Sequence, residues 1–193
     1  MSEILTIDTE SNIIKNEILN PLPIHDDRHP MLHHAIPEYD TTLLPNDRMS
    51  NLIKQLKMTM KLYGGIGLSA NQCGIQERVF IIGHEDFFMS CINPKVIDFG
   101  QESVKDNEGC LSYPGLYLKI ERPKSIIVEF TTESGEVKQM SLDGITARCF
   151  LHELDHMNGK VFTDLVGKTS LMLAKQKQNK IMKKMIRNHK KKK

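Results

Sequence analysis

The segment His152-Glu153-Leu154-Asp155-His156 places two histidines four residues apart, with a carboxylate beside the first. On an α-helix, side chains at positions i and i+4 lie one above the other with Cβ atoms about 5–6 Å apart, so both imidazoles can reach one metal ion. An irregular segment would not hold that separation. The segment therefore predicts a helix that carries metal ligands, with Glu153 in the place of the general base of a metal-dependent hydrolase.

The preceding residues support this helix and place the histidines on its inner face. Four residues follow spacings of four, three and four, which is one face of a 3.6-residue period: Ile145, Cys149, His152 and His156. Asp143 is suited to the N-cap, and Gly159 stands where a left-handed helix end is common. These two residues predict a helix of about four turns.

Two histidines leave a metal ion short of ligands, and Cys110 is the leading choice for a third. Gly109 allows close approach of the backbone, while Ser112 and Gly115 mark a segment rich in turn-forming residues. The chain has four cysteines, no CxxC pair and no segment typical of a signal peptide. We therefore expect cytoplasmic thiols rather than a disulfide framework or a four-cysteine zinc cluster.

Three separated motifs resemble those of peptide deformylases. The segment from Gly65 to Gln72 reads GIGLSANQ and is similar to the glycine-rich segment of that family. The segment from Glu108 to Ser112 reads EGCLS, and the histidine segment continues into Asn158-Gly159, as in the family. The order and spacing of the motifs also agree, so the resemblance covers roughly residues 20 to 167.

The resemblance implies removal of the N-formyl group from nascent polypeptides that begin with formylmethionine, with release of formate. Cys110, His152 and His156 would hold one divalent ion per chain and leave a fourth position open for water. Metal-bound water would attack the formyl carbon. Glu153 would act as the general base and then as the acid that protonates the leaving amine.

The resemblance also assigns residues to the substrate. The Gln72 side-chain amide and the backbone N–H of Leu111 would stabilise the developing oxyanion. Gly67 and its neighbours would let the peptide lie against the loop as an added strand, and Gly109 belongs to the same site. Three apolar residues are expected as walls of the methionine pocket, although core positions are an equally good interpretation: Ile66, Leu68 and Cys149.

The ligand types leave the metal open, because thiolate and imidazole suit Fe²⁺, Zn²⁺, Ni²⁺ and Co²⁺. The resemblance favours Fe²⁺. Asp155 is expected either to orient a ligating histidine or pair with a cation, or to be a solvated helix carboxylate. Two residues depart from the family pattern. Asn71 replaces a frequent Pro or Thr and predicts a freer backbone beside Gln72, and Leu151 replaces a frequent Gln and predicts a missing polar contact.

The rest of the chain predicts an α+β fold, with antiparallel β-sheets packed around the central metal-binding helix. Asn46 or Asp47 begins a helix that ends at Gly64, with this apolar face: Met49, Leu52, Ile53, Leu56, Met60 and Tyr63. Four runs are rich in β-branched residues and are typical of strands: 78–82, 91–99, 125–130 and 137–142. Residues 133–136 are typical of a hairpin turn. No run approaches a membrane span.

Residues 169–193 contain ten Lys or Arg and no Asp or Glu, which leaves 16 basic and 24 acidic residues in the rest of the chain. We therefore expect a catalytic domain, 1–168, with an N-terminal extension, 1–19, and a basic C-terminal helix or tail, 169–193. By resemblance, the tail would contact ribosomal RNA, and a frayed basic tail is the alternative.

Two other functions stay open at this point. A zinc endopeptidase would need a further His or Glu ligand downstream of His156, and no such residue stands out. A catalytically silent relative that only binds ribosomes would lack a chemical residue, yet Cys110, His152, Glu153 and Gln72 are all present. We therefore favour a monomeric, cytoplasmic enzyme that acts on N-formylmethionyl peptides and has no membrane partner.

Overall fold

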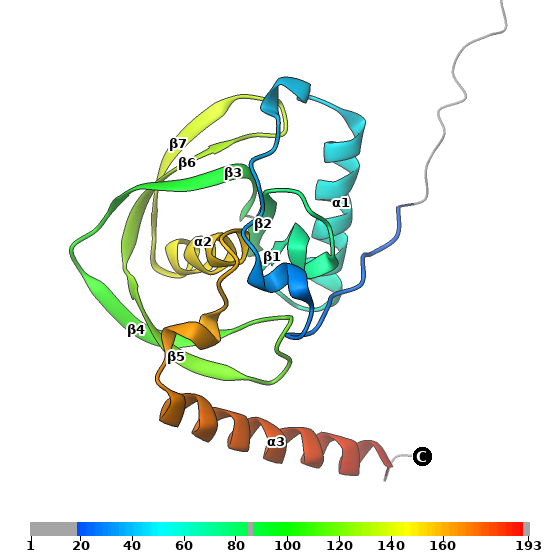
Figure 1. The fold of residues 1–193 in the computed structure, drawn as a ribbon, viewed down its shortest axis with the longest axis vertical. Helices are drawn as coiled ribbons and strands as arrows, with labels where there is room; N and C mark the ends of the chain where they lie inside the picture. Colours follow the sequence, from blue (N-terminus) through cyan, green and yellow to red (C-terminus); the bar gives the residue numbers. More distant parts are fainter. Residues whose placement is uncertain (1–18, 85–86, 191–193) are drawn as a thin grey trace, which may run out of the picture.

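The computed structural model describes residues 19–84 and 87–190, so nearly all of the expected extension, 1–19, lies outside the described residues. Within the described part the chain forms three α-helices: α1 (Asp47–Leu62), α2 (Gly144–Met157) and α3 (Lys168–Lys190). Four short 3-10 helices accompany them: η1 (Pro30–His33), η2 (Thr41–Leu43), η3 (Ala70–Cys73) and η4 (Phe162–Leu165). Figure 1 shows α2 at the centre of the molecule, enclosed by strands, and α3 along its lower edge.

Two antiparallel sheets surround α2. The larger has the order β1-β2-β3-β6-β7 and consists of β1 (Gly67–Ser69), β2 (Val79–His84), β3 (Phe87–Phe99), β6 (Ser125–Thr131) and β7 (Val137–Asp143). The smaller pairs β4 (Ser103–Gly109) with β5 (Tyr117–Pro123). Helix α2 contacts β1, β2, β6 and β7 of the larger sheet and β5 of the smaller one. The predicted α+β class, with antiparallel sheets around the histidine helix and a C-terminal helix, is confirmed.

The four predicted strands correspond to β2, β3, β6 and β7, and the predicted turn at 133–136 joins β6 to β7. Strands β1, β4 and β5 were not predicted. β1 has three residues, and β4 is mostly polar and is exposed except at Glu108. β5 alternates buried and exposed residues, but three of its seven residues are charged. Such strands become recognisable through their pairing partners rather than through their composition.

Helix α1 begins as predicted, because the Asn46 side chain accepts a hydrogen bond from the backbone N–H of Met49. Its predicted apolar face is buried, apart from its last member. Tyr63 is 53% exposed, because the helix ends at Leu62 and the chain turns at Gly64 with a φ of 68°. Tyr63 therefore lies beyond the last turn instead of on the buried face.

Helix α2 is amphipathic. Its apolar side packs on the larger sheet, and its polar side carries the two histidines. On its sheet side, Phe150 is fully buried and its ring meets that of Phe80 edge to face, with centroids 5.1 Å apart. Leu151 packs in the same apolar cluster. Ile145 was predicted to point inward but is 51% exposed, in the first turn of α2. Asp143 occupies the N-cap without a side-chain cap hydrogen bond.

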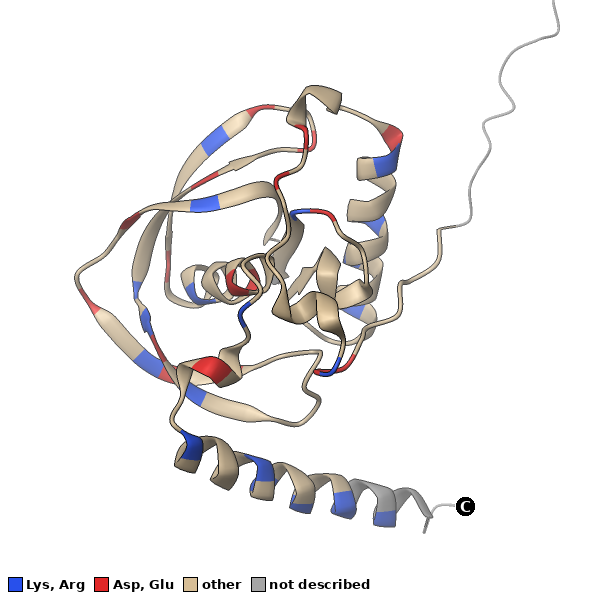
Figure 2. Cartoon of the chain, viewed as in Figure 1, with Lys and Arg blue, Asp and Glu red and all other residues tan. Residues whose placement is uncertain are grey.

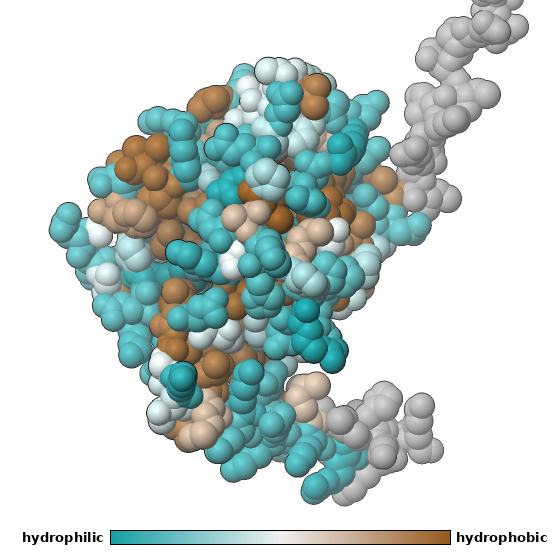
Figure 3. Space-filling view, viewed as in Figure 1, coloured by the Kyte–Doolittle hydropathy of each residue, from teal (hydrophilic) through white to brown (hydrophobic). Residues whose placement is uncertain are grey.

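Helix α3 packs against β5 and the segment before it. Leu171 and Ala174 cover an apolar cluster that includes Leu116 and Phe162, and the Gln178 side-chain amide donates to the Pro114 carbonyl at 2.8 Å. Figure 2 shows Lys and Arg, and no Asp or Glu, along the described part of α3, and Figure 3 shows hydrophilic side chains along this lower edge. Within residues 19–84 and 87–190, no helix combines the length and apolar character of a membrane span.

Candidate active site

The three predicted metal ligands meet in space. Cys110 follows β4, while His152 and His156 stand one turn apart on α2. Their candidate ligand atoms all lie within 4.8 Å of one another, and Cys110 Sγ is 3.3 Å from His156 Nε2. Both histidines are buried, and Cys110 is partly exposed. One thiol and two imidazoles at this separation fit a divalent ion such as zinc or ferrous iron and leave a coordination position for water.

Glu108 orients the first of these histidines. Its carboxylate is 6% exposed and lies 3.1 Å from His152 Nδ1. Arg122 donates to it twice, at 2.9 and 3.0 Å, and Arg148 donates once, at 2.7 Å. Burial alone would raise the pKa of Glu108, but the hydrogen bonds from His152 and Arg122 outweigh burial and lower the pKa to about 2. An ionised Glu108 can only accept, so Nδ1 of His152 carries the proton and Nε2 is free for a metal.

Arg122 and Arg148 connect the Glu108 carboxylate to other parts of the fold through further hydrogen bonds. Arg122 on β5 also donates to Asp155 at 2.7 Å, so Asp155 pairs with a cation rather than pointing freely into solvent. Arg148 on α2 donates to the carbonyls of Ile120 and Val104 in the smaller sheet. The orienting roles of the carboxylate and the arginines were not predicted. The available signal was Glu108, a charged residue two positions before Cys110, and Arg148, an arginine on the predicted histidine helix.

Glu153 lies on α2 beside the ligands and is 3% exposed. Its Oε2 has no hydrogen-bond partner among the described residues, and burial raises the pKa of Glu153 to about 7. The backbone of Gly67 passes directly against this carboxyl group. A Cβ on Gly67 would lie 2.7 Å from Cys149 Sγ and closer still to Glu153 Oε1. Only glycine leaves room for the unhindered carboxyl group at this point.

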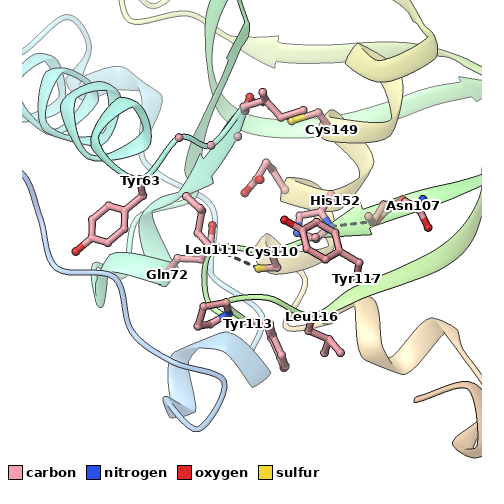
Figure 4. Close-up of a pocket in the computed structure, with 18 of the residues that line it drawn as sticks. Tyr63, Gln72, Asn107, Cys110, Leu111, Tyr113, Leu116, Tyr117, Cys149 and His152 are labelled. Atoms are coloured by element: carbon pink, nitrogen blue, oxygen red, sulfur yellow. Dashed lines mark hydrogen bonds and ion pairs between the residues drawn. The ribbon is translucent and has the colours of Figure 1, made fainter. Parts of the chain in front are cut away.

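Gln72 is held with its amide nitrogen toward the ligand sulfur. Its Oε1 accepts hydrogen bonds from the backbone N–H and the hydroxyl of Ser69, both at 3.0 Å. Its Nε2 is therefore fixed on the other side, 3.4 Å from Cys110 Sγ and 3.2 Å from Ser112 Oγ. Figure 4 shows Gln72, Cys110 and His152 around one cavity, with a dashed line joining Gln72 to Cys110.

A cavity of about 460 Å³ opens beside these groups. It is lined by most of the residues predicted for catalysis or substrate: Ile66, Gly67, Gln72, Gly109, Leu111, Cys149 and Glu153. Leu68 lies elsewhere, because it is fully buried in the apolar cluster between α1 and the larger sheet. Gly109 faces its β5 partner Tyr117, whose ring would be 2.8 Å from a Cβ at position 109.

Exposed apolar side chains at the cavity were missed by the sequence reasoning. Tyr63, Tyr117 and Ile145 line it and are 53%, 66% and 51% exposed. They come from the end of α1, the start of β5 and the first turn of α2, respectively. Their proximity depends on the packing of three elements, so no local pattern could have grouped them.

Comparison with known proteins gives one consistent family. The family model described as polypeptide deformylase matches residues 21–171. A peptide deformylase of Thermotoga sp. (strain RQ2) is 35% identical over 132 residues, which cover 68% of this chain and 80% of the relative. One of Prochlorococcus marinus (strain NATL1A) is 43% identical over 126 residues, or 63% of this chain and 62% of the relative, so the match spans less than two thirds of that protein.

Solved structures agree with the sequence relatives. A peptide deformylase from Synechococcus elongatus in complex with actinonin has a TM-score of 0.77 and 33% identity, covering 82% of this chain and 88% of that chain. A Met-Ala-Ser bound class I type b peptide deformylase from Acinetobacter baumannii has a TM-score of 0.73 and 27% identity, covering 76% of this chain and 98% of that chain.

Proposed function

This chain belongs to the peptide deformylase family of metal-dependent hydrolases, and from that premise we propose how its residues remove the formyl group from N-formylmethionyl peptides. The observation that carries the proposal is the convergence of Cys110, His152 and His156, at a cavity that is lined by Cys110, His152 and the buried Glu153. The endopeptidase alternative lacks support, because the third ligand is a cysteine upstream of the helix. The silent alternative lacks support as well, because Gln72, Cys110, His152 and Glu153 line the cavity and His156 lies beside Cys110 and His152.

Glu153 is the proposed general base. A divalent ion held by Cys110, His152 and His156 would lower the pKa of a bound water from about 15.7 to about 7. Glu153 takes the proton of the attacking water and then protonates the leaving amine. Its pKa of about 7, raised by burial, suits a group that must accept and return a proton near neutral pH. The absence of a hydrogen-bond partner for Oε2 among the described residues leaves that oxygen free for a water molecule.

Gln72 and Leu111 are the proposed oxyanion donors. The Ser69 hydrogen bonds fix the Gln72 amide, and Leu111 follows the ligand Cys110 and lines the cavity. A donor that is fixed before the reaction needs no reorganisation as charge develops, which is the main advantage of such sites.

The substrate would lie along Gly67 and Gly109, with Ile66 and Cys149 beside the methionine side chain. The location of all four residues at the cavity supports this placement. The Met-Ala-Ser bound relative supports a peptide that begins with methionine. Leu68 contributes to this site only through the core, since it packs away from the cavity.

The proposed native metal is Fe²⁺, bound once per chain. The donor set also accommodates Zn²⁺, Ni²⁺ and Co²⁺, and ligand type alone does not select among them. The decisive experiment is anaerobic purification followed by metal analysis and a formate-release assay with formyl-Met-Ala-Ser. We expect about one ion per chain and formate release, and full metal occupancy without formate would overturn the proposed activity.

We also propose that α3 binds ribosomal RNA through its basic outer face. Lys175, Lys177 and Lys180 are exposed, while the opposite side of α3 packs on the body of the protein. Phosphate contacts of this kind weaken steeply with salt. Changing the three lysines to Glu should reduce co-sedimentation with ribosomes. The matched triple change at exposed Lys54, Lys61 and Lys105 should not, and equal sedimentation of both variants would exclude this site.

We further propose that the chain divides into two regions, 1–168 and 169–193, and that the protein is a cytoplasmic monomer. The four cysteines are unpaired, which is typical of a reducing compartment. Because α3 packs against β5 and Pro114, the division describes charge and sequence more than independent folding. Size-exclusion chromatography with light scattering tests the monomer, and a mass of twice 22.1 kDa would contradict it.

A further inference from the structure

Asn71 joins two segments that carry catalytic residues. It lies in η3, directly before Gln72, and is fully buried. Its side-chain Nδ2 donates to the backbone carbonyl of His156 at 2.7 Å, across 85 residues of sequence. The same nitrogen is 3.3 Å from the carbonyl of Met31 in η1. One amide group therefore connects η1, η3 and the last turn of α2.

The last turn of a helix depends on outside partners, because its final carbonyls have no intrahelical donors. At the end of α2, the Met157 carbonyl accepts from the Ile36 N–H at 2.9 Å and from Arg78 at 2.8 Å. The His156 carbonyl accepts from the Gly159 N–H at 3.2 Å and, more closely, from Asn71. Asn71 is thus a buried side-chain donor to the backbone of a metal ligand.

The two histidine ligands are held in different ways. Glu108 fixes the ring of His152 through Nδ1. The Nδ1 of His156 is buried and has no hydrogen-bond partner among the described residues. No described residue therefore orients the His156 ring through Nδ1, and the protein positions this ring through the backbone to which Asn71 donates.

We propose that Asn71 is a positioning residue that sets His156 relative to Gln72. The hydrogen bond fixes the last turn of α2, and with it His156 Nε2, 3.3 Å from Cys110 Sγ. It also fixes η3, where Gln72, the residue after Asn71, presents its amide to the same sulfur at 3.4 Å. The hydrogen bond of the Asn71 side chain therefore restrains the backbone that was expected to be freer at this position. This inference rests on the proposed roles of His156 and Gln72.

The test measures metal loss as well as turnover. Asn71→Ala removes the donor, and Asn71→Leu removes it while keeping the number and branching of the side-chain heavy atoms. For both we expect transfer of Co²⁺ from the loaded protein to a chelator to be about 10-fold faster, and kcat to fall by a similar factor with KM changed less. Asn46→Ala is the matched control, because Asn46 makes comparable hydrogen bonds at the start of α1, with Met49 N–H, Tyr39 and Leu43.

Metal release at the parent rate from Asn71→Ala, or parent behaviour of Asn71→Leu, would overturn the proposal, because the lost donor would then not matter. Equal metal loss from Asn46→Ala would overturn it too, since general destabilisation would explain the effect. Metal transfer is measured without substrate. A protein that holds Co²⁺ but releases no formate would therefore contradict the proposed activity and still give a result for Asn71.

Discussion

The carboxylate of Glu108 lies 3.1 Å from Nδ1 of His152, and the same carboxylate is held by Arg122 and Arg148. The arrangement couples the smaller sheet to α2 through a buried charge network. Because the hydrogen bonds from His152 and Arg122 keep the pKa of Glu108 low, Glu108 stays ionised as an acceptor and the tautomer of His152 is fixed. The geometry of the metal site thus depends on residues that do not touch the metal.

Glu108→Gln should therefore weaken metal binding. A neutral amide cannot match the carboxylate as acceptor for both His152 and the arginines, and the loss of such partners typically costs about 10–100-fold in affinity. Chelator competition on the purified protein measures this metal affinity. The control is Glu102→Gln, which removes an exposed carboxylate that pairs with Lys124 at 2.9 Å. Equal affinity in both variants would show that Glu108 does not orient the ligand.

Glu153→Gln should keep the metal and lose turnover. The amide has nearly the same shape but cannot accept a proton, so we expect kcat to fall by about 10²–10⁴. Metal analysis and formate release from the same preparation separate the two effects. Glu121→Gln, at an exposed position of β5, should retain the parent rate. A metal-loaded Glu153→Gln protein with parent activity would remove Glu153 from the mechanism.

Gln72→Ala should lower kcat with little effect on metal content. Loss of one oxyanion donor typically costs about 10²–10³ in rate. The exposed Gln76, four residues later, gives the control Gln76→Ala. Steady-state kinetics with a formyl-Met peptide measures the change. If KM rises while kcat stays at the parent value, Gln72 serves substrate binding rather than the developing charge.

Gly67→Ala should impair activity through crowding. The added Cβ would lie 2.7 Å from Cys149 Sγ and against the Glu153 carboxyl group, so the general base must move. Displacement of about 1 Å can cost 10²-fold in rate. Gly167→Ala is the control, because a Cβ there meets no atom within 4 Å. Full activity of Gly67→Ala would show that the loop adjusts without moving Glu153.

The cysteines should differ in reactivity and pH dependence. Burial raises the pKa of Cys73 to about 12 and that of Cys91 well above its usual value, so both thiols stay protonated when the pH rises from 7 to 9. Their alkylation in the native protein should be slow and nearly unchanged across this range, because the thiolate is the nucleophile. Cys110 is partly exposed and should react first without metal.

Mass spectrometry after iodoacetamide treatment locates the modified residue. Added Zn²⁺ should protect Cys110, since a bound thiolate is unavailable for alkylation. Alkylation of Cys110 at the same rate with and without metal would contradict its role as a ligand. Rapid modification of Cys91 would instead indicate that the core opens, because this thiol is fully buried.

Local sequence patterns predicted part of the site. The four-residue separation of His152 and His156 requires a helix, and the helix end near Gly159 has the expected left-handed turn, with a φ of 69°. The same reasoning gave α1 with its Asn46 cap and four strands of the larger sheet. These features depend on hydrogen bonds and side-chain periodicities over a few residues, which the order of amino acids specifies directly.

The tertiary structure decided which side chains share a space. Leu68 and Ile66 are two apolar residues of one motif, yet Leu68 packs in the core and Ile66 lines the cavity, because β1 begins only at Gly67 and Ile66 lies in the bend before it. The partners of Glu108 and the bond from Asn71 to His156 join residues from different elements. Such contacts exist only once sheets and helices pack, so the sequence supplied the reacting groups and the fold supplied the residues that hold them in place.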